Sequence, residues 1–154
     1  MYLVDTNVLS AGAPTKAVAA PDLAIWMDRN STALYLSVIT IAEVEDGIAK
    51  SRRLGAHRKA GRLSEWLATL LHLYDARVLP VDLATARQVG MLADHARGLG
   101  HAPGLADLAI AATAQVRGFT ILTRNLRHFV PLAVPALNPF DSLPTGSKAS
   151  EGSS

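Results

Sequence analysis

Short apolar runs alternate with longer amphipathic stretches along most of the 154-residue chain. The short runs are rich in β-branched residues and predict strands at residues 2–4, 34–39, 76–81, 119–123 and 134–140. The longer stretches repeat their apolar positions with helical spacing and predict helices over 22–30, from 41 onward, and over 61–74, 83–99 and 105–117. Strands that alternate with helices in this way are typical of βαβ units. The pattern therefore predicts an α/β fold with a mostly parallel sheet covered by helices on both faces.

The predicted domain spans residues 1–141, because no interior segment is long enough to act as a linker between two domains. A chain of this size can bury roughly two thirds of the surface that it exposes when unfolded. Residues 142–154 are small and polar with nothing to bury, which predicts a disordered C-terminal tail.

Composition narrows the class of protein. The chain has no cysteine, which fits a cytoplasmic protein and excludes thiolate metal sites and cysteine nucleophiles. No apolar stretch approaches the roughly 18 residues of a membrane span, and the first residues lack the pattern of a signal peptide. We therefore expect a soluble, cytoplasmic protein with no membrane partner.

The formal charge of +2 permits a nucleic-acid partner without requiring one. Six of the fifteen Lys and Arg residues lie in one short segment, "KSRRLGAHRKAGR" at 50–62. Two interpretations remain open for this segment. It can be a solvated helix end and loop, or it can contact phosphates.

Three carboxylates stand at positions that suggest chemistry, and each also has an ordinary structural explanation. Asp5 directly follows the first apolar run and could cap the helix after it. Glu43 lies three residues after Thr40, the spacing of a capping box. Asp107 lies in the first turn of a predicted helix, where the helix dipole favours an anion.

The helix that carries Asp107 is apolar or small on nearly every side from Leu105 to Val116, which predicts that it is buried. A lone buried carboxylate is costly unless something pairs with it. Asp5 and Glu43 are expected at the carboxyl edge of the sheet, where Thr123 and Asn125 also offer oxygens. Such hard oxygen donors, with no basic residue between them, favour a shared Mg²⁺ or Mn²⁺ site, and separate caps remain the alternative.

Four blocks of sequence, "VDTNVLS", "SVITIAEVEDGI", "ADLAIAATA" followed by "FTILTRNLRHF", and "LNPF", resemble the PIN-domain family. The resemblance is to the VapC-type toxins of bacterial type II toxin–antitoxin pairs and extends from about residue 1 to residue 141. It implies a three-layer α/β/α PIN-like domain with a mostly parallel central sheet. The implied activity is metal-dependent endoribonuclease activity, in which a water activated by Mg²⁺ or Mn²⁺ leaves a 5′ phosphate and a 3′ hydroxyl.

The resemblance also implies roles for single residues. Asp5, Glu43 and Asp107 match the metal-binding carboxylates of the family, and Thr6, Asn7 and Thr123 match supporting positions. Asn125 matches a fourth catalytic position at which many members carry Asp, and its amide oxygen can ligate but adds no charge. Arg124, Arg127 and His128 either hold substrate phosphates or have a local structural role. The implied partners are a cognate antitoxin protein, the RNA substrate and a second copy of the chain in a homodimer.

Two rival functions remain to be separated from this one. An aspartyl-phosphate phosphotransferase would use Asp5 as nucleophile, but it wants a second Asp where this chain has Asn7. A catalytically weak scaffold would keep the PIN fold and bind RNA or antitoxin without turnover. Metal-dependent turnover distinguishes the scaffold from the nuclease.

Overall fold

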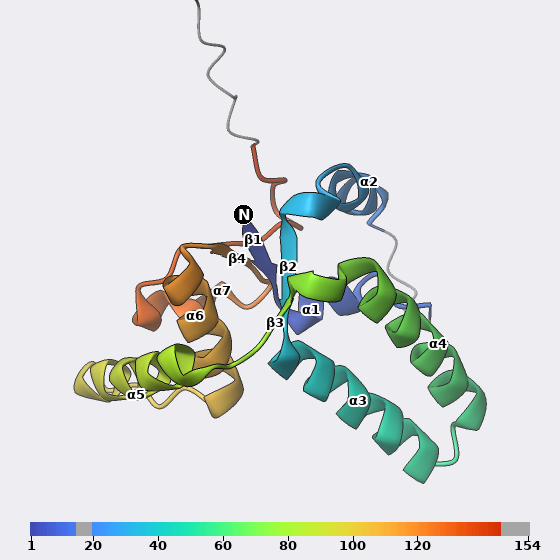
Figure 1. Ribbon diagram of the computed structural model, residues 1–154, viewed down its shortest axis with the longest axis horizontal. Coiled ribbons are helices and arrows are strands. Elements are labelled where there is room, and N and C mark those ends of the chain that lie inside the picture. The colour runs from blue at the N-terminus through green and yellow to red at the C-terminus, as the bar shows by residue number, and fades with distance from the viewer. Residues whose placement is uncertain (15–19, 146–154) are drawn as a thin grey trace, which may run out of the picture.

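The computed structural model describes residues 1–14 and 20–145 and contains one five-stranded sheet in the order β3-β2-β1-β4-β5 (Figure 1). The strands are β1 (Tyr2–Val4), β2 (Leu34–Ser37), β3 (Val78–Leu79), β4 (Thr120–Leu122) and β5 (Ala136–Leu137). Every neighbouring pair is parallel, and Leu3 of β1 lies opposite both Tyr35 of β2 and Ile121 of β4. The predicted parallel sheet is confirmed.

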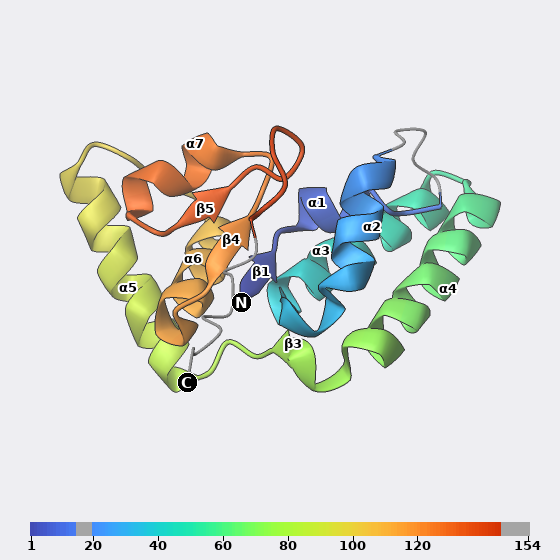
Figure 2. The same cartoon turned by 90° about the horizontal axis from the view of Figure 1, so that it is seen from above.

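Helices cover both faces of this sheet. They are α1 (Thr6–Ser10), α2 (Pro21–Arg29), α3 (Val38–Arg53), α4 (His57–Tyr74), α5 (Leu83–Gly98), α6 (Leu105–Arg117) and α7 (Leu126–Phe129), with short 3₁₀ turns at Ser31–Ala33, Asp75–Arg77 and Val130–Leu132. Helices α5 and α6 lie on one side of the sheet, and α2, α3 and α4 lie on the other (Figures 1 and 2). The three-layer α/β/α arrangement is therefore confirmed.

The apolar strands are buried on both faces because successive side chains point to opposite sides of a sheet. Leu3 and Ile121 join the core cluster that also contains residues of α5, α6 and α7. Val4 and Leu122, the next residues along each strand, join the cluster formed with α1 and α2. The unbroken apolar runs of the sequence thus place alternate side chains in the cores on the two faces of the sheet.

Several predicted boundaries are wrong by a few residues. The second strand ends at Ser37 instead of residue 39, because Ser37 caps helix α3 and Val38 is already helical. The last predicted strand, 134–140, is reduced to Ala136–Leu137. Helix α4 begins at His57 instead of residue 61, because its strongly basic first turn gave no apolar signal for a helix.

Helices α3 and α4 form a hairpin that projects from the sheet (Figures 1 and 2). Val44 and Ile48 of α3 pack against Ala60 and Leu67 of α4 in a small core of their own. Helix α3 therefore begins at the carboxyl edge of the sheet and ends at the exposed tip of the hairpin.

None of the helices in the described part of the chain is long and apolar enough to cross a membrane. Of the predicted C-terminal tail, residues 142–145 contain no helix or strand. The remaining tail residues, 146–154, lie outside the described residues.

Candidate functional site

Asp5 stands at the carboxyl end of the central strand β1 and is the N-cap residue of α1, as predicted. Although Asp5 is acidic, only 6% of the residue is exposed. The backbone N–H of Asp5 still donates to the carbonyl of Leu122 at 2.9 Å, which extends the sheet by one residue. The strand pairing therefore fixes the position of this buried carboxyl group.

Hydrogen bonds from three neighbouring groups hold both oxygens of Asp5. Oδ1 accepts from the backbone N–H of Thr6 at 2.9 Å. Oδ2 accepts from the Thr123 hydroxyl at 2.8 Å and from Asn7 Nδ2 at 3.2 Å. Thr123, at the end of β4, is fully buried. Two of the predicted supporting residues, Asn7 and Thr123, thus orient Asp5 directly.

Glu43 is brought to the same edge of the sheet by α3, and its Oε1 accepts from the Thr6 hydroxyl at 2.7 Å. The alternative explanation of Glu43, a capping box with Thr40, is wrong. Ser37 is the cap residue, with its Oγ accepting from the Ile39 N–H at 3.0 Å. Because the helix begins directly at the end of β2, Glu43 lies in its second turn and faces Thr6. No local pattern in the sequence signals this contact between residues 37 positions apart.

Asp107 lies in the first turn of α6, as predicted, and the helix is buried from Leu108 to Ala114. Its side chain is 28% exposed, and its Oδ2 lies 3.1 Å from Nδ1 of His128 on α7. The expectation that no basic residue stands among the carboxylates is therefore wrong. Sequence reasoning missed this pair because only the packing of α7 beside α6 brings residues 107 and 128 together.

The two residues after Thr123, Arg124 and Asn125, border the site. The Thr123 hydroxyl accepts from the backbone N–H of Asn125 at 3.0 Å, and the Arg124 N–H donates to Asn7 Oδ1 at 3.0 Å. The Arg124 guanidinium stacks on the ring of Phe140, 3.9 Å from its centroid, which gives Arg124 a local structural role. The Asn125 side chain makes no hydrogen bond to any residue that the structure describes, although its backbone is held.

The carboxylates interact electrostatically across the site. Burial raises the pKa of Asp5, hydrogen bonds from Thr123 and Thr6 lower it, and the nearby Asp107 carboxylate raises it further. Partial desolvation also raises the pKa of Glu43, and both Asp5 and Asp107 add to that rise. The structure therefore brings Asp5, Glu43 and Asp107 close enough to repel one another.

The chemistry of these groups suits a hard divalent cation. All the candidate ligand atoms are carboxylate, hydroxyl or amide oxygens. A cation bound among them would relieve the mutual repulsion of the carboxylates. Within residues 1–14 and 20–145, however, no group of three or more His, Cys, Asp or Glu side chains has the arrangement of a ready-made metal site. A shared ion would have to compete with Thr6 for Glu43 and with His128 for Asp107.

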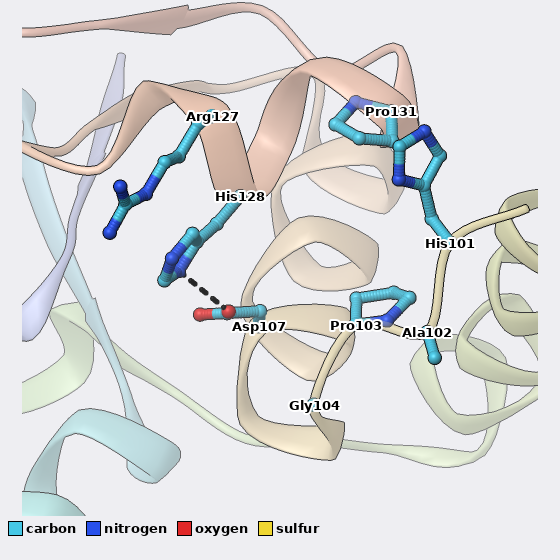
Figure 3. A pocket seen from close by; sticks show the side chains of 8 residues that line it. All are labelled: His101, Ala102, Pro103, Gly104, Asp107, Arg127, His128 and Pro131. Carbon is cyan, nitrogen blue, oxygen red and sulfur yellow. Dashed lines mark ion pairs between the residues drawn. The ribbon is translucent and has the colours of Figure 1, made fainter.

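A cavity of about 300 Å³ adjoins Asp107 (Figure 3). It is bounded by His101, Pro103, Asp107, Arg127, His128 and Pro131. Figure 3 shows the His128 ring turned towards Asp107, with Arg127 on the same short helix. Arg127 and His128 thus border the cavity beside Asp107, whereas Arg124 stacks on Phe140.

The raised pKa of Glu43 predicts a pH-dependent gain in stability for Glu43→Gln in the absence of metal. The folded state holds the Glu43 proton more tightly than the unfolded chain does, because the pKa of Glu43 lies above the value near 4.5 that it has when unfolded. The wild type therefore loses stability as pH rises from 4.5 through the raised folded pKa, and the glutamine variant does not. We expect a gain below about 1 kcal/mol at pH 7, because water screens this exposed side chain, and no gain near pH 4.

Urea unfolding in EDTA at both pH values measures this gain. Glu45→Gln removes the same charge from an exposed position of the same helix and is the matched control. A gain of equal size at both pH values, or one shared by the control, would contradict the assignment of repulsion to Glu43.

Comparisons with known proteins agree with this geometry. The family model described as "PIN domain" matches residues 2–132. A protein named VapC ribonuclease Y4jK, from Sinorhizobium fredii, is 35% identical over 92% of this chain and 99% of its own length. Toxin FitB from Neisseria gonorrhoeae is 33% identical over 91% of this chain and 99% of its own.

Solved structures give the same result. A chain in the crystal structure of FitAcB from Neisseria gonorrhoeae superposes with a TM-score of 0.80 at 33% identity, covering 91% of this chain and 99% of that one. A chain in the structure of FitAB bound to an IR36 DNA fragment gives a TM-score of 0.73 at 31% identity, covering 91% of this chain and 96% of that one. The family model, the relatives and the fold together show that this chain belongs to the PIN-domain family.

Proposed function

We propose that this protein is a metal-dependent endoribonuclease that acts as the toxin of a toxin–antitoxin pair. One observation carries the proposal: a buried, hydrogen-bonded Asp5 at the carboxyl end of the central strand, repelled by Glu43 and Asp107. Such an arrangement costs stability unless a cation offsets it, and strained electrostatics of this kind cluster at functional sites. Two relatives support the activity and the role, since one is named a ribonuclease and the other a toxin.

Asp5, Glu43 and Asp107 would hold Mg²⁺ or Mn²⁺, with Asn125 as a neutral fourth group. When bound, the ion supplies a positive charge next to the phosphoryl oxygens and lowers the pKa of a water molecule. Thr123 and Asn7 fix both the position and the rotamer of Asp5. Thr6 fixes Glu43 in the same way, through its hydroxyl. No side chain of this set needs to act as a nucleophile.

The proposed partners follow from the same relatives. One structural neighbour, with 26% identity and a TM-score of 0.58, is titled as a member of the VapBC family of toxin-antitoxin systems from Mycobacterium tuberculosis, and another is titled FitAB bound to an IR36 DNA fragment. We therefore propose a cognate antitoxin as the partner that blocks the site, and a homodimer as the assembly of the toxin. The cytoplasm, where RNA and antitoxin would both be available, is the proposed compartment.

Calorimetric titration with Mn²⁺ tests the site without knowledge of the RNA. We expect the wild type to bind the ion, and Asp107→Asn to bind it at least about tenfold more weakly, a loss of about 1.4 kcal/mol. The matched control is Asp94→Asn, because Asp94 is an exposed acid on α5 whose ion pair is with Arg97. Circular dichroism shows whether each variant is folded.

Cleavage of a mixed RNA pool, with Mn²⁺ or with EDTA, completes the test. Cleavage that requires the ion and is lost in Asp107→Asn is the expected result. Binding of Mn²⁺ without any cleavage, or no binding at millimolar concentration, would overturn the nuclease and favour the RNA-binding or antitoxin-binding scaffold.

A further inference from the structure

The tip of the α3–α4 hairpin carries the densest positive charge of the chain. We call residues 50–62 the basic tip. Its six basic side chains are all exposed, and the segment contains no acidic residue: Lys50, Arg52, Arg53, Arg58, Lys59 and Arg62. The whole chain has a net charge of +2, so the residues outside the tip carry nine basic and thirteen acidic side chains and a net charge of −4. The protein is therefore strongly polarised.

The charges of the basic tip form no ion pair with the part of the chain that the structure describes. Within residues 1–14 and 20–145, the ion pairs are Arg97 with Asp94 and His128 with Asp107, and both lie elsewhere. Arg52 donates a hydrogen bond to the Ser64 hydroxyl at 2.9 Å, which links the two helices. The remaining cations of the tip are exposed and donate no side-chain hydrogen bond to any other residue that the structure describes.

Helix stability explains only half of this charge. Lys50, Arg52 and Arg53 occupy the last turn of α3, where the helix dipole favours cations. Arg58 and Lys59 occupy the first turn of α4, where the dipole disfavours them. That turn has no acidic residue, and its cap residue, Ala56, offers no side-chain hydrogen bond. Local choices that oppose the fold in this way are expected where function requires them.

We propose that the basic tip is a second RNA contact, separate from the active site, which holds the substrate backbone while the carboxylate site acts on it. The inference rests on the proposed ribonuclease function. It adds a docking surface that reads phosphates and not bases, so it raises affinity for long RNA without adding sequence preference.

Helix α3 sets the distance between the two sites. Glu43 and Arg53 are ten residues apart on one helix, which corresponds to about 15 Å at a rise of about 1.5 Å per residue. At the spacing of about 3.4 Å per phosphate of a stacked strand, this distance is about four or five nucleotides. Asp46 lies between them, so the phosphate contacts are expected to begin at Lys50.

RNA fits this surface better than an acidic protein segment does. The cations occupy two helix ends joined by a short turn, and all six of them are exposed. A flexible strand with one negative charge per nucleotide can follow such a surface and gain affinity from the counterions that it releases.

The test compares the variant Arg53→Gln/Arg58→Gln/Lys59→Gln with the wild type in binding to an unstructured RNA of about 20 nucleotides, followed by fluorescence anisotropy in EDTA. The matched control, Arg29→Gln/Arg87→Gln/Arg117→Gln, removes the same charge from exposed positions on α2, α5 and α6. We expect the tip variant to bind at least about tenfold more weakly and to reduce the slope of log K against log salt by about 2, since each lost contact contributes about 0.7. The control should change affinity by less than about twofold.

Equal weakening in the two variants would overturn the proposal, because bulk charge alone would then explain the binding. Unchanged affinity in the tip variant, or tighter binding to a poly-glutamate peptide than to RNA, would overturn it as well. A melting temperature close to that of the wild type shows that the tip variant is folded, since the changes at Arg58 and Lys59 relieve the charge at the start of α4 and offset the loss of the favourable Arg53 at the end of α3.

A short substrate separates this proposal from the proposed function. At the same spacing, an RNA of about three nucleotides spans about 10 Å, which is less than the roughly 15 Å from Glu43 to Arg53, the residue of α3 that the tip variant changes. Metal-dependent cleavage of this RNA at equal rates by wild type and tip variant, together with slower cleavage of the long RNA by the variant, is the expected result. Cleavage of both lengths without any effect of the variant overturns the docking surface alone. Failure of the wild type to cleave either length overturns the nuclease.

Discussion

Asp5→Asn is expected to lower RNA cleavage by at least about 100-fold, because loss of groups that merely support a metal ligand already costs about 10-fold to 100-fold. Asp5 is the most buried of the three carboxylates and the one fixed by three hydrogen-bond donors. Its replacement removes one negative charge from the proposed metal site and leaves the shape nearly unchanged. The measurement is the initial rate of metal-dependent cleavage under saturating Mn²⁺.

The amide of the variant has one predictable structural effect. If its oxygen keeps the hydrogen bond from the Thr6 N–H, its nitrogen faces the Asn7 amide nitrogen, which donates to Asp5 in the wild type. Thr123 can adapt by rotating its hydroxyl hydrogen. Removal of a buried charge offsets this local mismatch, so the melting temperature in EDTA should not fall greatly. A folded variant that retains cleavage within about twofold of Asp94→Asn would remove Asp5 from the catalytic machinery.

Phe129→Ala is expected to reduce the free energy of unfolding by about 3–5 kcal/mol, the cost of an emptied aromatic site in a core. Phe129 is fully buried in the cluster that joins α5 and α6 to the sheet. The cavity left by the change cannot collapse easily, because Leu3 and Ile121 of the same core cluster belong to paired central strands. Urea unfolding followed by circular dichroism measures the loss.

Two variants at the same place calibrate this result. Phe129→Leu keeps much of the volume and should cost less than the alanine change. Val130→Ala alters the next residue, which is 72% exposed, and should change stability by less than about 0.5 kcal/mol. A loss below about 1.5 kcal/mol in Phe129→Ala would mean that α7 is not held by this core. His128 directly precedes Phe129 on α7. Loss of the Phe129 side chain is therefore also expected to loosen the contact between His128 and Asp107.

Most of the fold could be predicted from local pattern. The apolar runs at residues 2–4 and 119–123 identify central strands because a parallel strand covered on both faces needs apolar side chains on both. Helix α6 was recognisable for the same reason, with Asp107 as the one charge between Leu105 and Val116. The strand ends were less predictable, because Ser37 could continue the strand or cap the helix, and only the chain direction after β2 decides between these.

Some features of the candidate site could likewise be predicted from the sequence, and others could not. Asp5 and its neighbours Thr6 and Asn7 are visible as a polar stop after an apolar strand. The role of Thr6 was not visible, since its hydroxyl serves Glu43 and not Asp5. The basic tip could be recognised in the sequence as a charge cluster. That its cations lie at the unfavourable end of the α4 dipole became clear only from the residue at which the helix begins.

By itself, the sequence determined the principal strands and the longer helices, that the sheet is mostly parallel, and that acidic residues stand at its carboxyl edge, because these properties depend on periodicity and on the order of elements along the chain. The short helix α7 was not predicted. Only the tertiary structure decided that Glu43 meets Thr6, that His128 pairs with Asp107, and that the basic tip stands a helix length from the carboxylates. The physical reason is that these contacts join residues distant in sequence, so they exist only after packing against the shared sheet has fixed the positions of α3, α6 and α7.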